Sequence, residues 1–480
     1  MSGRLPYIFN SQDLEKLLVN YNKLEGVRPT PTPERVYIWD ETLRDGEQTP
    51  GVYLTLSEKL DIAKALDDIG VHLITIGFPA VSETEYEIVK AFSKESFSRA
   101  KIAAVARPRQ SDIEACIECG VQTVNVFMPT SDLLLKIFRH NHAQALKIVS
   151  QGIELAKAHG MHVNWIMEDA TRSQMEYLVE VTQTAIDAGA ESVVLSDTVG
   201  VMMPFAWKYF VRTVKERVPK LRNNEIPMGV HVHNDFGMAT AGTVMAVYQG
   251  VTLPHTCING YGERAGNAAL EEVVIALEYN GINTGITTEK LFELSKLAEK
   301  YFLIPLPAHK AVVGEFCFSH ESGLHINAIV AHPRTYEPIN PQHVGRERHL
   351  YVGKFSGTGS IRDKLLGIGL RLPDDILKKI VSEIKRKREE TPKEVNRKKF
   401  NEVKEILKYL KVGITDKEVF QIVKHVVGPN FKEEWGKARN TFDENNGNHE
   451  NTTKTDKENQ KTENDTGKSS TRRKDGGSNK

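Results

Sequence analysis

The sequence predicts an α/β fold: a (β/α)₈ barrel, then a small, mainly helical accessory region and a disordered C-terminal tail. Short β-branched apolar runs alternate eight times with amphipathic stretches across residues 36–278. Polar clusters follow several of these runs, and residues 440–480 have almost no apolar side chain. Strands that alternate with helices predict parallel βαβ units, and eight such units in roughly 240 residues match a closed barrel. An open, doubly wound sheet is the alternative.

The expected elements follow one another in regular order. The expected strands cover residues 36–40, 73–78, 102–106, 123–128, 162–167, 192–197, 228–234 and 256–259. The expected helices cover residues 57–69, 83–97, 111–119, 144–158, 173–188, 203–218, 238–249 and 268–278. The first helix has apolar residues spaced close to 3.6 residues apart. It begins at a capping box, in which Thr55 and Glu58 satisfy backbone amides that have no partner inside the helix.

The sequence beyond the barrel predicts further helices and then a change of character. Residues 287–302 form one expected helix, and residues 372–427 form two or three, rich in Lys and Glu. The expected domains are an N-terminal extension (1–35), the barrel (36–300), the helical accessory region (301–436) and the polar tail (437–480). The tail cannot bury enough apolar surface to offset its ordering entropy, so we expect it to be disordered.

Composition and charge exclude several classes of protein. Lys plus Arg and Asp plus Glu both number 63, so the formal net charge is 0, which argues against a general nucleic-acid binder. Apolar runs are far shorter than the roughly 20 residues of a membrane span, and residues 1–20 lack the apolar core of a signal peptide. Four cysteines in 480 residues fit a reducing compartment. We therefore expect a soluble, cytoplasmic enzyme with neither nucleic acid nor membrane as a partner.

Two polar clusters, far apart in sequence, predict a metal site. Asp45 lies in the loop after the first strand, and this loop opens onto the C-terminal face of a barrel, where active sites lie. His231 and His233 alternate on the seventh strand, so their side chains point to the same side. Strands one and seven both neighbour strand eight in a closed barrel, so Asp45 can meet the two histidines. Two imidazoles and a carboxylate, with open positions, suit a catalytic divalent cation.

Other polar residues follow strands on the same face. The glycine-rich segment after strand eight offers Asn267 as an oxygen ligand, with Glu263 and Arg264 to orient the ligands. Glu168 ends strand five and Thr198 follows strand six. The structural alternatives are a salt-bridged turn at the first cluster and an ordinary glycine-rich loop after strand eight.

Three segments together resemble the signature sequences of the alkylmalate synthase family, whose members include 2-isopropylmalate, homocitrate and citramalate synthases. They are residues 43–48 (LRDGEQ), 231–235 (HVHND) and 262–267 (GERAGN). The family condenses acetyl-CoA with a 2-oxo acid to give a substituted malate and free CoA. The resemblance implies a divalent metal (Mg, Mn or Zn), acetyl-CoA as co-substrate, a 2-oxo acid as the other substrate and a homodimer.

The resemblance also implies roles for single residues. The implied metal ligands are Asp45, His231, His233 and Asn267. The expected substrate-binding residues are Gln48, Thr198, Glu263 and Arg264. The expected catalytic residues are Arg44, Glu168, His325 and Tyr336. Arg44 would polarise the keto group, His325 backed by Glu168 would take a proton from the acetyl methyl group, and Tyr336 would donate to the thioester oxygen. For the region around His325 and Tyr336, interdomain hydrogen bonding is the structural alternative.

Residues 168–172, 264–272 and 320–323 look more like 2-isopropylmalate synthases than homocitrate synthases. The first expected substrate is therefore 2-oxoisovalerate, for leucine biosynthesis; the alternatives are 2-oxoglutarate and pyruvate. Thr75 departs from the pattern, because 2-isopropylmalate synthases usually carry Glu there, and residues 127–131 depart as well. No segment resembles the leucine-binding regulatory domain, so feedback through that domain is not expected. A metal-dependent lyase on the same barrel and a non-catalytic homologue are the alternatives from other classes.

Overall fold

The computed structural model of the protein describes residues 17–428, except 25, 28, 30, 31, 391 and 409–412. The chain divides into two compact units, Met1–Leu410 and Lys411–Lys480. The tail expected at 437–480 and the first part of the expected N-terminal extension lie outside the described residues.

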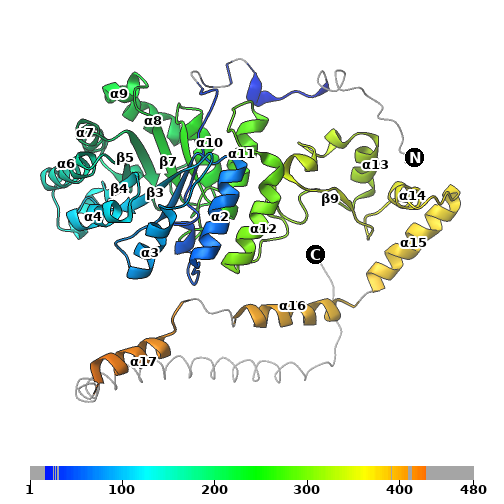
Figure 1. Cartoon of the computed structure of the whole chain (residues 1–480). Coiled ribbons are helices and arrows are strands. Elements are labelled where there is room, and N and C mark those ends of the chain that lie inside the picture. The colour runs from blue at the N-terminus through cyan, green and yellow to red at the C-terminus, as the bar shows by residue number, and fades with distance from the viewer. Residues whose placement is uncertain are drawn as a thin grey trace, which may run out of the picture. The chain divides into compact units, whose positions relative to one another are not determined.

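In the described part of the first unit, eight parallel strands close into a barrel in sequence order, and β8 pairs with β1. The strands are β1 (Trp39–Asp40), β2 (Leu73–Gly77), β3 (Lys101–Ala106), β4 (Thr123–Pro129), β5 (His162–Glu168), β6 (Ser192–Asp197), β7 (Met228–Val232) and β8 (Leu253–Thr256). In Figure 1 the helices of this region lie around the strands. The predicted (β/α)₈ barrel is confirmed.

Helices connect the strands and cover the outside of the barrel. They are α2 (Leu56–Ile69), α3 (Glu83–Phe92), α4 (Gln110–Cys119), α5 (Asp132–Ile137), α6 (His142–Ala158), α7 (Met175–Asp187), α8 (Ala206–Arg217), α9 (Pro219–Arg222), α10 (Ala239–Val247), α11 (Leu270–Tyr279) and α12 (Leu291–Phe302). The capping box at the start of α2 is present, with Thr55 and Glu58 each accepting from the other's backbone amide. The short 3-10 turn η2 (Gly46–Gln48) carries Gln48, and a second 3-10 turn, η4 (Ile258–Gly260), directly follows β8.

Several elements differ from the sequence expectation. Strand one, expected at 36–40, is the shorter β1 at Trp39–Asp40. Strand eight, expected at 256–259, is β8 at Leu253–Thr256, and the chain turns into η4 directly after it. Pro254 argues against a strand at this place in the sequence, because proline lacks the backbone N–H group that a central strand normally donates. The structure tolerates it where β8 pairs with β7 at only two registered positions. Two short helices, α5 before α6 and α9 after α8, were not predicted from the sequence. Ser131 caps α5 by accepting from Leu134.

The accessory region after the barrel is mainly helical, as predicted. It contains β9 (Ser319–His320), α13 (Gly323–Ala331), β10 (His349–Leu350), α14 (Thr358–Leu366), α15 (Asp374–Glu390) and α16 (Lys393–Lys408). Strands β9 and β10 form a parallel pair. Lys310 joins the segment before β9 to the barrel through ion pairs with Glu271 and Glu272 of α11. The described part of the second unit contains α17 (Asp416–Val427).

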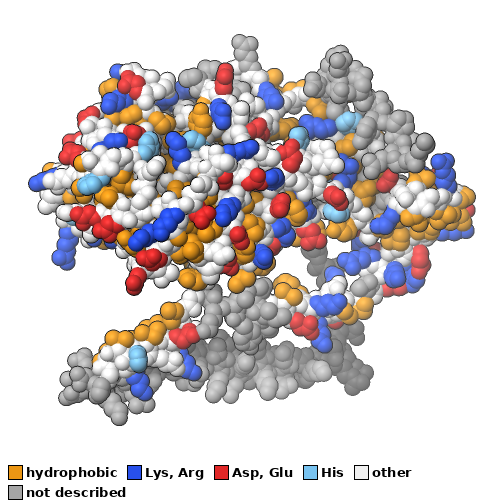
Figure 2. Space-filling model, viewed as in Figure 1, with side chains coloured by type: hydrophobic (Ala, Val, Ile, Leu, Met, Phe, Trp, Pro, Cys, Tyr) orange, Lys and Arg blue, Asp and Glu red, His pale blue; other side chains and the backbone are white. Residues whose placement is uncertain are grey.

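The surface carries charges of both signs, and hydrophobic side chains gather along the accessory helices (Figure 2). On α16, Val395, Phe400 and Val403 are all more than half exposed. On α17, considered separately, Ile422 and Val426 are also more than half exposed. Exposed apolar side chains at helical spacing are typical of a helix that packs against a partner. None of the described helices is both long and apolar enough to cross a lipid bilayer.

A buried lysine ties the loop after β1 to the outer helices. The Lys59 side chain, on α2, is fully buried. Its ammonium lies 2.7 Å from a carboxylate oxygen of Glu47 in η2 and 2.7 Å from one of Glu85 in α3. Glu47 also accepts a hydrogen bond from the amide of Leu54. One cation therefore holds two carboxylates that would otherwise repel each other across three segments.

Replacing Lys59 by Met should strongly destabilise the fold. The substitution keeps the length of the side chain but leaves Glu47 and Glu85 without a cation, and breaking a buried ion pair from one side costs about 3–5 kcal/mol. Urea unfolding followed by circular dichroism measures the change. The matched control is Lys64→Met on the same helix. Its pair with Glu95 is exposed, and exposed pairs contribute about 1 kcal/mol or less. Equal losses in both variants would contradict this account of Lys59.

Candidate active site

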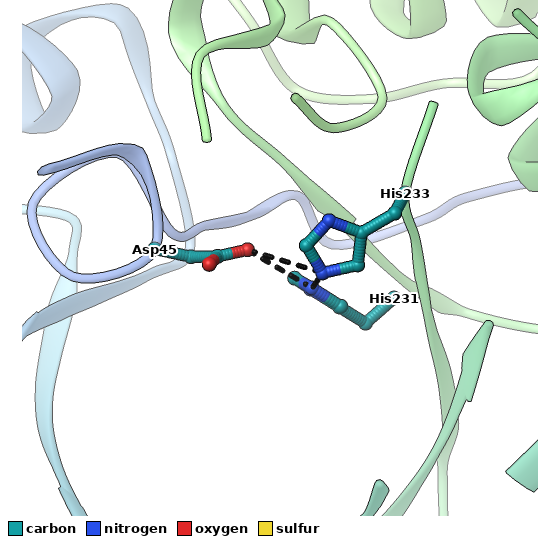
Figure 3. Close-up of side chains that lie close together, drawn as sticks. All are labelled: Asp45, His231 and His233. Atoms are coloured by element: carbon teal, nitrogen blue, oxygen red, sulfur yellow. Dashed lines mark hydrogen bonds and ion pairs between the residues drawn. The ribbon is translucent and has the colours of Figure 1, made fainter. Parts of the chain in front are cut away.

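Asp45, His231 and His233 converge at the mouth of the barrel (Figure 3). The Oδ2 atom of Asp45 lies 3.2 Å from Nε2 of His231 and 3.6 Å from Nε2 of His233. The two Nε2 atoms are 3.1 Å apart. All three side chains are buried, and their candidate ligand atoms lie within 4.8 Å of one another. Barrel closure brings them together, because β8 pairs with both β7 and β1.

Asn267 completes this group from the loop after β8. Its Nδ2 donates to Oδ2 of Asp45 at 2.8 Å and to the carbonyl of Tyr261 at 3.1 Å. Its Oδ1 is buried without a hydrogen-bond partner. A buried amide oxygen without a donor is costly, whereas a cation beside it would satisfy it. The donor set of two imidazoles, one carboxylate and one amide oxygen therefore fits a divalent cation.

The local electrostatics also suit a cation. Burial by itself would raise the pKa of Asp45, but Arg44 and the two histidines lower it well below its ordinary value. Burial and the neighbouring His231 lower the pKa of His233 to about 3. Asp45 is therefore ionised and His233 neutral at physiological pH, which are the protonation states that a metal ligand needs.

Two glycines shape the loop that carries Asn267. Gly262 has a φ of +155°, and a Cβ on it would lie 2.1 Å from Nδ2 of Asn267. Gly266 has a φ of +85°, and its Cβ would lie 1.9 Å from the carbonyl oxygen of Gly260. Glycine is therefore needed at both positions for the loop to fold back on itself and place Asn267 beside Asp45.

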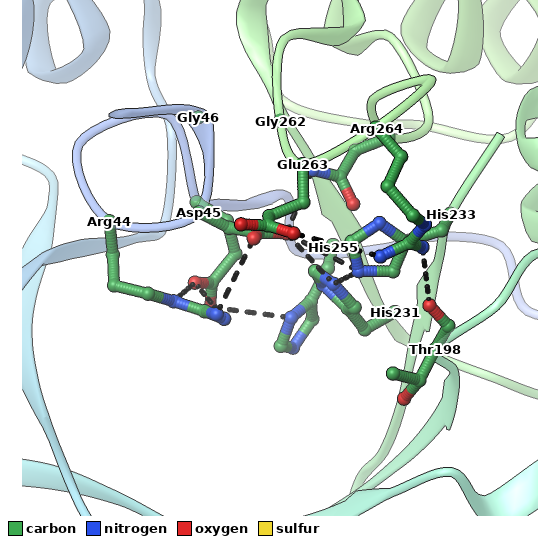
Figure 4. Close-up of polar contacts among 12 residues, drawn as sticks. Arg44, Asp45, Gly46, Thr198, His231, His233, His255, Gly262, Glu263 and Arg264 are labelled. Atoms are coloured by element: carbon green, nitrogen blue, oxygen red, sulfur yellow. Dashed lines mark hydrogen bonds and ion pairs between the residues drawn. The ribbon is translucent and has the colours of Figure 1, made fainter. Parts of the chain in front are cut away.

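Among the hydrogen bonds and ion pairs of the described residues, Arg264 in the same loop makes none with the candidate metal ligands. It makes two hydrogen bonds to the carboxylate of Asp235, at 2.8 and 3.0 Å. It makes a third to the carbonyl of Thr198 at 2.7 Å (Figure 4). Its guanidinium thus joins the loops that follow β6, β7 and β8. Thr198 in turn accepts from the amide of Asp169 at 2.9 Å, so the rim of the barrel is fixed by a continuous set of polar contacts.

Arg44 is held by a fully buried carboxylate. Glu41 accepts from Nε of Arg44 at 2.8 Å and lies 2.6 Å from its Nη2. A second arginine nitrogen, Nη1, lies 3.8 Å from Asp45. His255 of β8 approaches the other oxygen of Glu41 at 3.4 Å. The sequence analysis did not predict roles for Glu41 and His255. Glu41 lies in the polar segment directly after the first strand, three residues before Arg44.

A cavity of about 340 Å³ opens beside the candidate metal ligands. The structure brings nine expected site residues to its wall: Arg44, Asp45, Gln48, Glu168, Thr198, His231, His233, Glu263 and Arg264. Burial raises the pKa of Glu168. The wall also contains an apolar group that the sequence analysis did not single out: Phe78, Val105, Phe127 and Ile166. Strand alternation would have found part of it, because Ile166 lies two residues before Glu168.

His325 and Tyr336 are not among the residues that line this cavity. Their rings stack on each other with centroids 4.0 Å apart, within the accessory region. A second aromatic neighbour, His320, lies 6.5 Å from His325 and contacts Glu337, which Arg348 binds through two hydrogen bonds. Contacts within the accessory region therefore hold the two rings together outside the cavity.

Comparison with known proteins identifies the family. A sequence model described as HMGL-like matches residues 35–298, and one described as homocitrate synthase post-HMGL domain-like matches residues 312–392. The 2-isopropylmalate synthase of Methanocaldococcus jannaschii is 42% identical, over 82% of this chain and 72% of that protein. The chain belongs to the alkylmalate synthase family. The resemblance that the three motifs indicated is confirmed, and the chain is a condensing enzyme of this acetyl-CoA-dependent family.

The names of the relatives do not agree on a substrate. Homocitrate synthase AksA of Methanopyrus kandleri is 44% identical, over 75% of this chain and 90% of that protein. The 2-isopropylmalate synthase of Sulfurisphaera tokodaii is 40% identical, over 75% of this chain and 93% of that protein. Among solved structures, a hydroxymethylglutaryl-CoA lyase from Pseudomonas aeruginosa matches with a TM-score of 0.51 and 22% identity, over 57% of this chain and 95% of that chain. This last likeness supports the barrel fold alone.

Removal of the Asp45 carboxylate should abolish tight metal binding. We expect Asp45→Ala to bind Mn²⁺ or Zn²⁺ about 100-fold more weakly or worse, because even residues outside the ligand sphere cost 10- to 100-fold. Isothermal titration calorimetry of the metal-stripped protein measures this. Asp235→Asn is the control: it removes a nearby negative charge that pairs with Arg264 and should cause a much smaller loss. If both variants bind metal as the parent does, Asp45 is not a ligand.

Proposed function

We propose that the enzyme condenses acetyl-CoA with an apolar 2-oxo acid, with 2-oxoisovalerate as the preferred substrate and 2-isopropylmalate as the product. The observation that carries this choice is the apolar part of the cavity wall: Phe78, Val105, Phe127 and Ile166. Burying an aliphatic substituent against these side chains is favourable, at roughly 25 cal/mol per Å² of apolar surface.

The charges in the cavity argue against a dicarboxylic substrate. Two arginines line the wall, and both are already paired: Arg44 with Glu41, and Arg264 with Asp235. The second carboxylate of 2-oxoglutarate would face the apolar side chains without a free cation among the described lining residues. Burial of an unpaired carboxylate is unfavourable. Pyruvate would leave part of the apolar wall unfilled, a smaller penalty of about 1–3 kcal/mol.

The site residues divide the chemistry between them. Asp45, His231, His233 and Asn267 would hold a divalent metal, which when bound supplies Lewis-acid polarisation of the 2-oxo acid. Arg44 faces the same space and stabilises negative charge on the former keto oxygen as the new carbon–carbon bond forms. Glu168 and Thr198 contact the oxo acid. A base removes the proton from the acetyl methyl group, and water then hydrolyses the thioester to release CoA.

That base is His325, and it acts in the cavity of a second copy of the chain. His325 and Tyr336 lie on the accessory region and do not line the cavity of the barrel. The exposed apolar faces of α16 and α17 each offer a surface for packing between copies. In such a homodimer the accessory region of one copy places His325 as the base and Tyr336 as a donor to the thioester oxygen.

A metal-dependent lyase on the same barrel is the alternative reaction class. The match of residues 312–392 to a region described as homocitrate synthase post-HMGL domain-like argues against it, because that description names a condensing enzyme and not a lyase. Cleavage of a hydroxyacyl-CoA without consumption of acetyl-CoA would favour it.

A panel of 2-oxo acids tests the proposed function. The purified enzyme is assayed for release of the CoA thiol with 2-oxoisovalerate, pyruvate and 2-oxoglutarate, each with Mg²⁺, Mn²⁺ or Zn²⁺. We expect the highest kcat/KM with 2-oxoisovalerate, pyruvate about 10- to 200-fold lower, and 2-oxoglutarate lowest. A preference for 2-oxoglutarate would overturn the substrate assignment, and no release with any acid would overturn the proposed activity.

Mixing two inactive variants tests the shared site. Asp45→Ala and His325→Ala should each be inactive alone. After co-refolding, random pairing of two chains makes half of the dimers mixed, and each mixed dimer has one intact site, so about a quarter of the parent activity should return. Recovery of CoA release is the measurement, with each variant refolded alone as the control. Without recovery, His325 would act within its own chain or not at all.

A further inference from the structure

The interior of the barrel contains a continuous set of hydrogen bonds among five buried side chains. We call Ser192, Asn164, Asn125, Thr75 and Trp39 the polar network. Ser192 donates to Asn164 at 2.6 Å, Asn164 donates to Asn125 at 2.8 Å, and Asn125 donates to the hydroxyl of Thr75 at 3.0 Å. Nε1 of Trp39 donates to the same hydroxyl at 2.8 Å. These residues come from β6, β5, β4, β2 and β1.

The polar network ends on the carboxylate of Glu41. The hydroxyl of Thr75 donates to Oε1 of Glu41 at 2.8 Å. The indole of Trp39 can only donate, and Oδ1 of Asn125 is already occupied as the acceptor for Asn164. Both neighbours therefore donate to Thr75, and its single hydroxyl hydrogen is left for Glu41. Every bond in the network thus points toward this one carboxylate.

The polar network lies in a buried region, where polar groups without hydrogen-bond partners cost free energy. Its members are at most 3% exposed, and the neighbouring interior residues form an apolar cluster that includes Leu73, Ile166 and Val194. Replacing both partners of a buried hydrogen bond by apolar groups of the same shape can be nearly neutral or stabilising. The presence of five polar side chains here is therefore poorly explained by stability alone. A fully hydrogen-bonded network does, however, fix the geometry of the group on which it ends.

We propose that the polar network is a positioning device for Arg44: it fixes Oε1 of Glu41, so that the other carboxylate oxygen holds the guanidinium at the place where charge develops. Thr75 is the decisive positioning residue, because it is the sole link from the network to Glu41 among the hydrogen bonds of the described residues. The inference rests on the proposed function, in which Arg44 stabilises the former keto oxygen. It adds a set of residues that touch neither substrate nor metal.

The main test compares three variants by steady-state kinetics of CoA release. Thr75→Val removes the hydroxyl at nearly constant shape and should lower kcat by roughly 10- to 100-fold, the cost of a small misplacement at a reacting centre. The metal stoichiometry should stay unchanged. Thr75→Ser keeps the hydroxyl and should restore most of kcat. Thr243→Val is the matched control: Thr243 is a fully buried threonine on α10 whose hydroxyl has no partner, so its kcat should equal that of the parent.

A double-mutant cycle separates positioning from general loss of structure. If Thr75 acts through Glu41, the effect of Thr75→Val on kcat should shrink at least several-fold in a Glu41→Gln background; independent effects would multiply. The same cycle is read in the thermal unfolding midpoint, which needs no substrate. Should Thr75→Val not fold, Ser192→Ala at the far end of the network replaces it, with a smaller fall in kcat and the same dependence on Glu41.

The outcomes decide the two proposals separately. If the parent releases CoA and Thr75→Val keeps the parent kcat, or its effect is independent of Glu41, the positioning role is wrong and the proposed function stands. If the parent releases no CoA with any 2-oxo acid, the proposed function is wrong. In that case the thermal unfolding midpoints decide whether Thr75 and Glu41 are coupled. Independent shifts of the midpoint in the two variants would show that Thr75 does not act through Glu41.

Discussion

Closure of the barrel is the constraint on which the site depends. Asp45 follows β1, His231 lies near the end of β7 and His233 directly follows β7, nearly 190 positions later in the chain. They meet because β8 lies between β7 and β1 and pairs with both. In an open sheet, the first and seventh strands would not share this neighbour. The glycine-rich loop after β8 then brings Asn267 to the same point, since Gly262 and Gly266 let it fold back against Asp45.

The cavity wall combines ionic and apolar side chains. The wall includes the candidate metal ligands Asp45, His231 and His233 with Arg44, and also the rings of Phe78 and Phe127 with Val105. A 2-oxo acid also combines the two characters, with a chelating keto and carboxylate group at one end and a substituent at the other. Burying charged side chains costs free energy. The carboxylate of Glu41, which accepts a hydrogen bond from Thr75, offsets this cost for Arg44.

Much of this arrangement could be predicted from the sequence. The eight alternations give the barrel, and the i, i+2 spacing of His231 and His233 predicts that both imidazoles point to one side. The meeting with Asp45 follows from strand order alone. The pairing of Arg264 with Asp235 could not be predicted, because loop conformation decides it. The separation of His325 and Tyr336 from the cavity could not be predicted either, because it depends on how the accessory region packs.

Thr75 shows a different limit of sequence reasoning. Taken alone, it is a departure from the glutamate usual in 2-isopropylmalate synthases. In the structure its hydroxyl binds Glu41, so a carboxylate still occupies this part of the interior and comes from the residue directly after the neighbouring strand β1. A position read by itself cannot reveal such an exchange, because the two residues are 34 positions apart and only the β1–β2 pairing makes them neighbours.

The buried Lys59 has a consequence for the lifetime of the protein when the divalent cation is scarce. Through Glu47 it fastens the short turn that begins directly after Asp45 to α2 and α3. Anything that binds only the native state stabilises it by mass action, so a cation gripped by Asp45 would also reinforce this edge of the barrel. Depletion of the cation would loosen the same edge, exposing its backbone to proteases and shortening the lifetime of the idle enzyme before any chemistry is attempted.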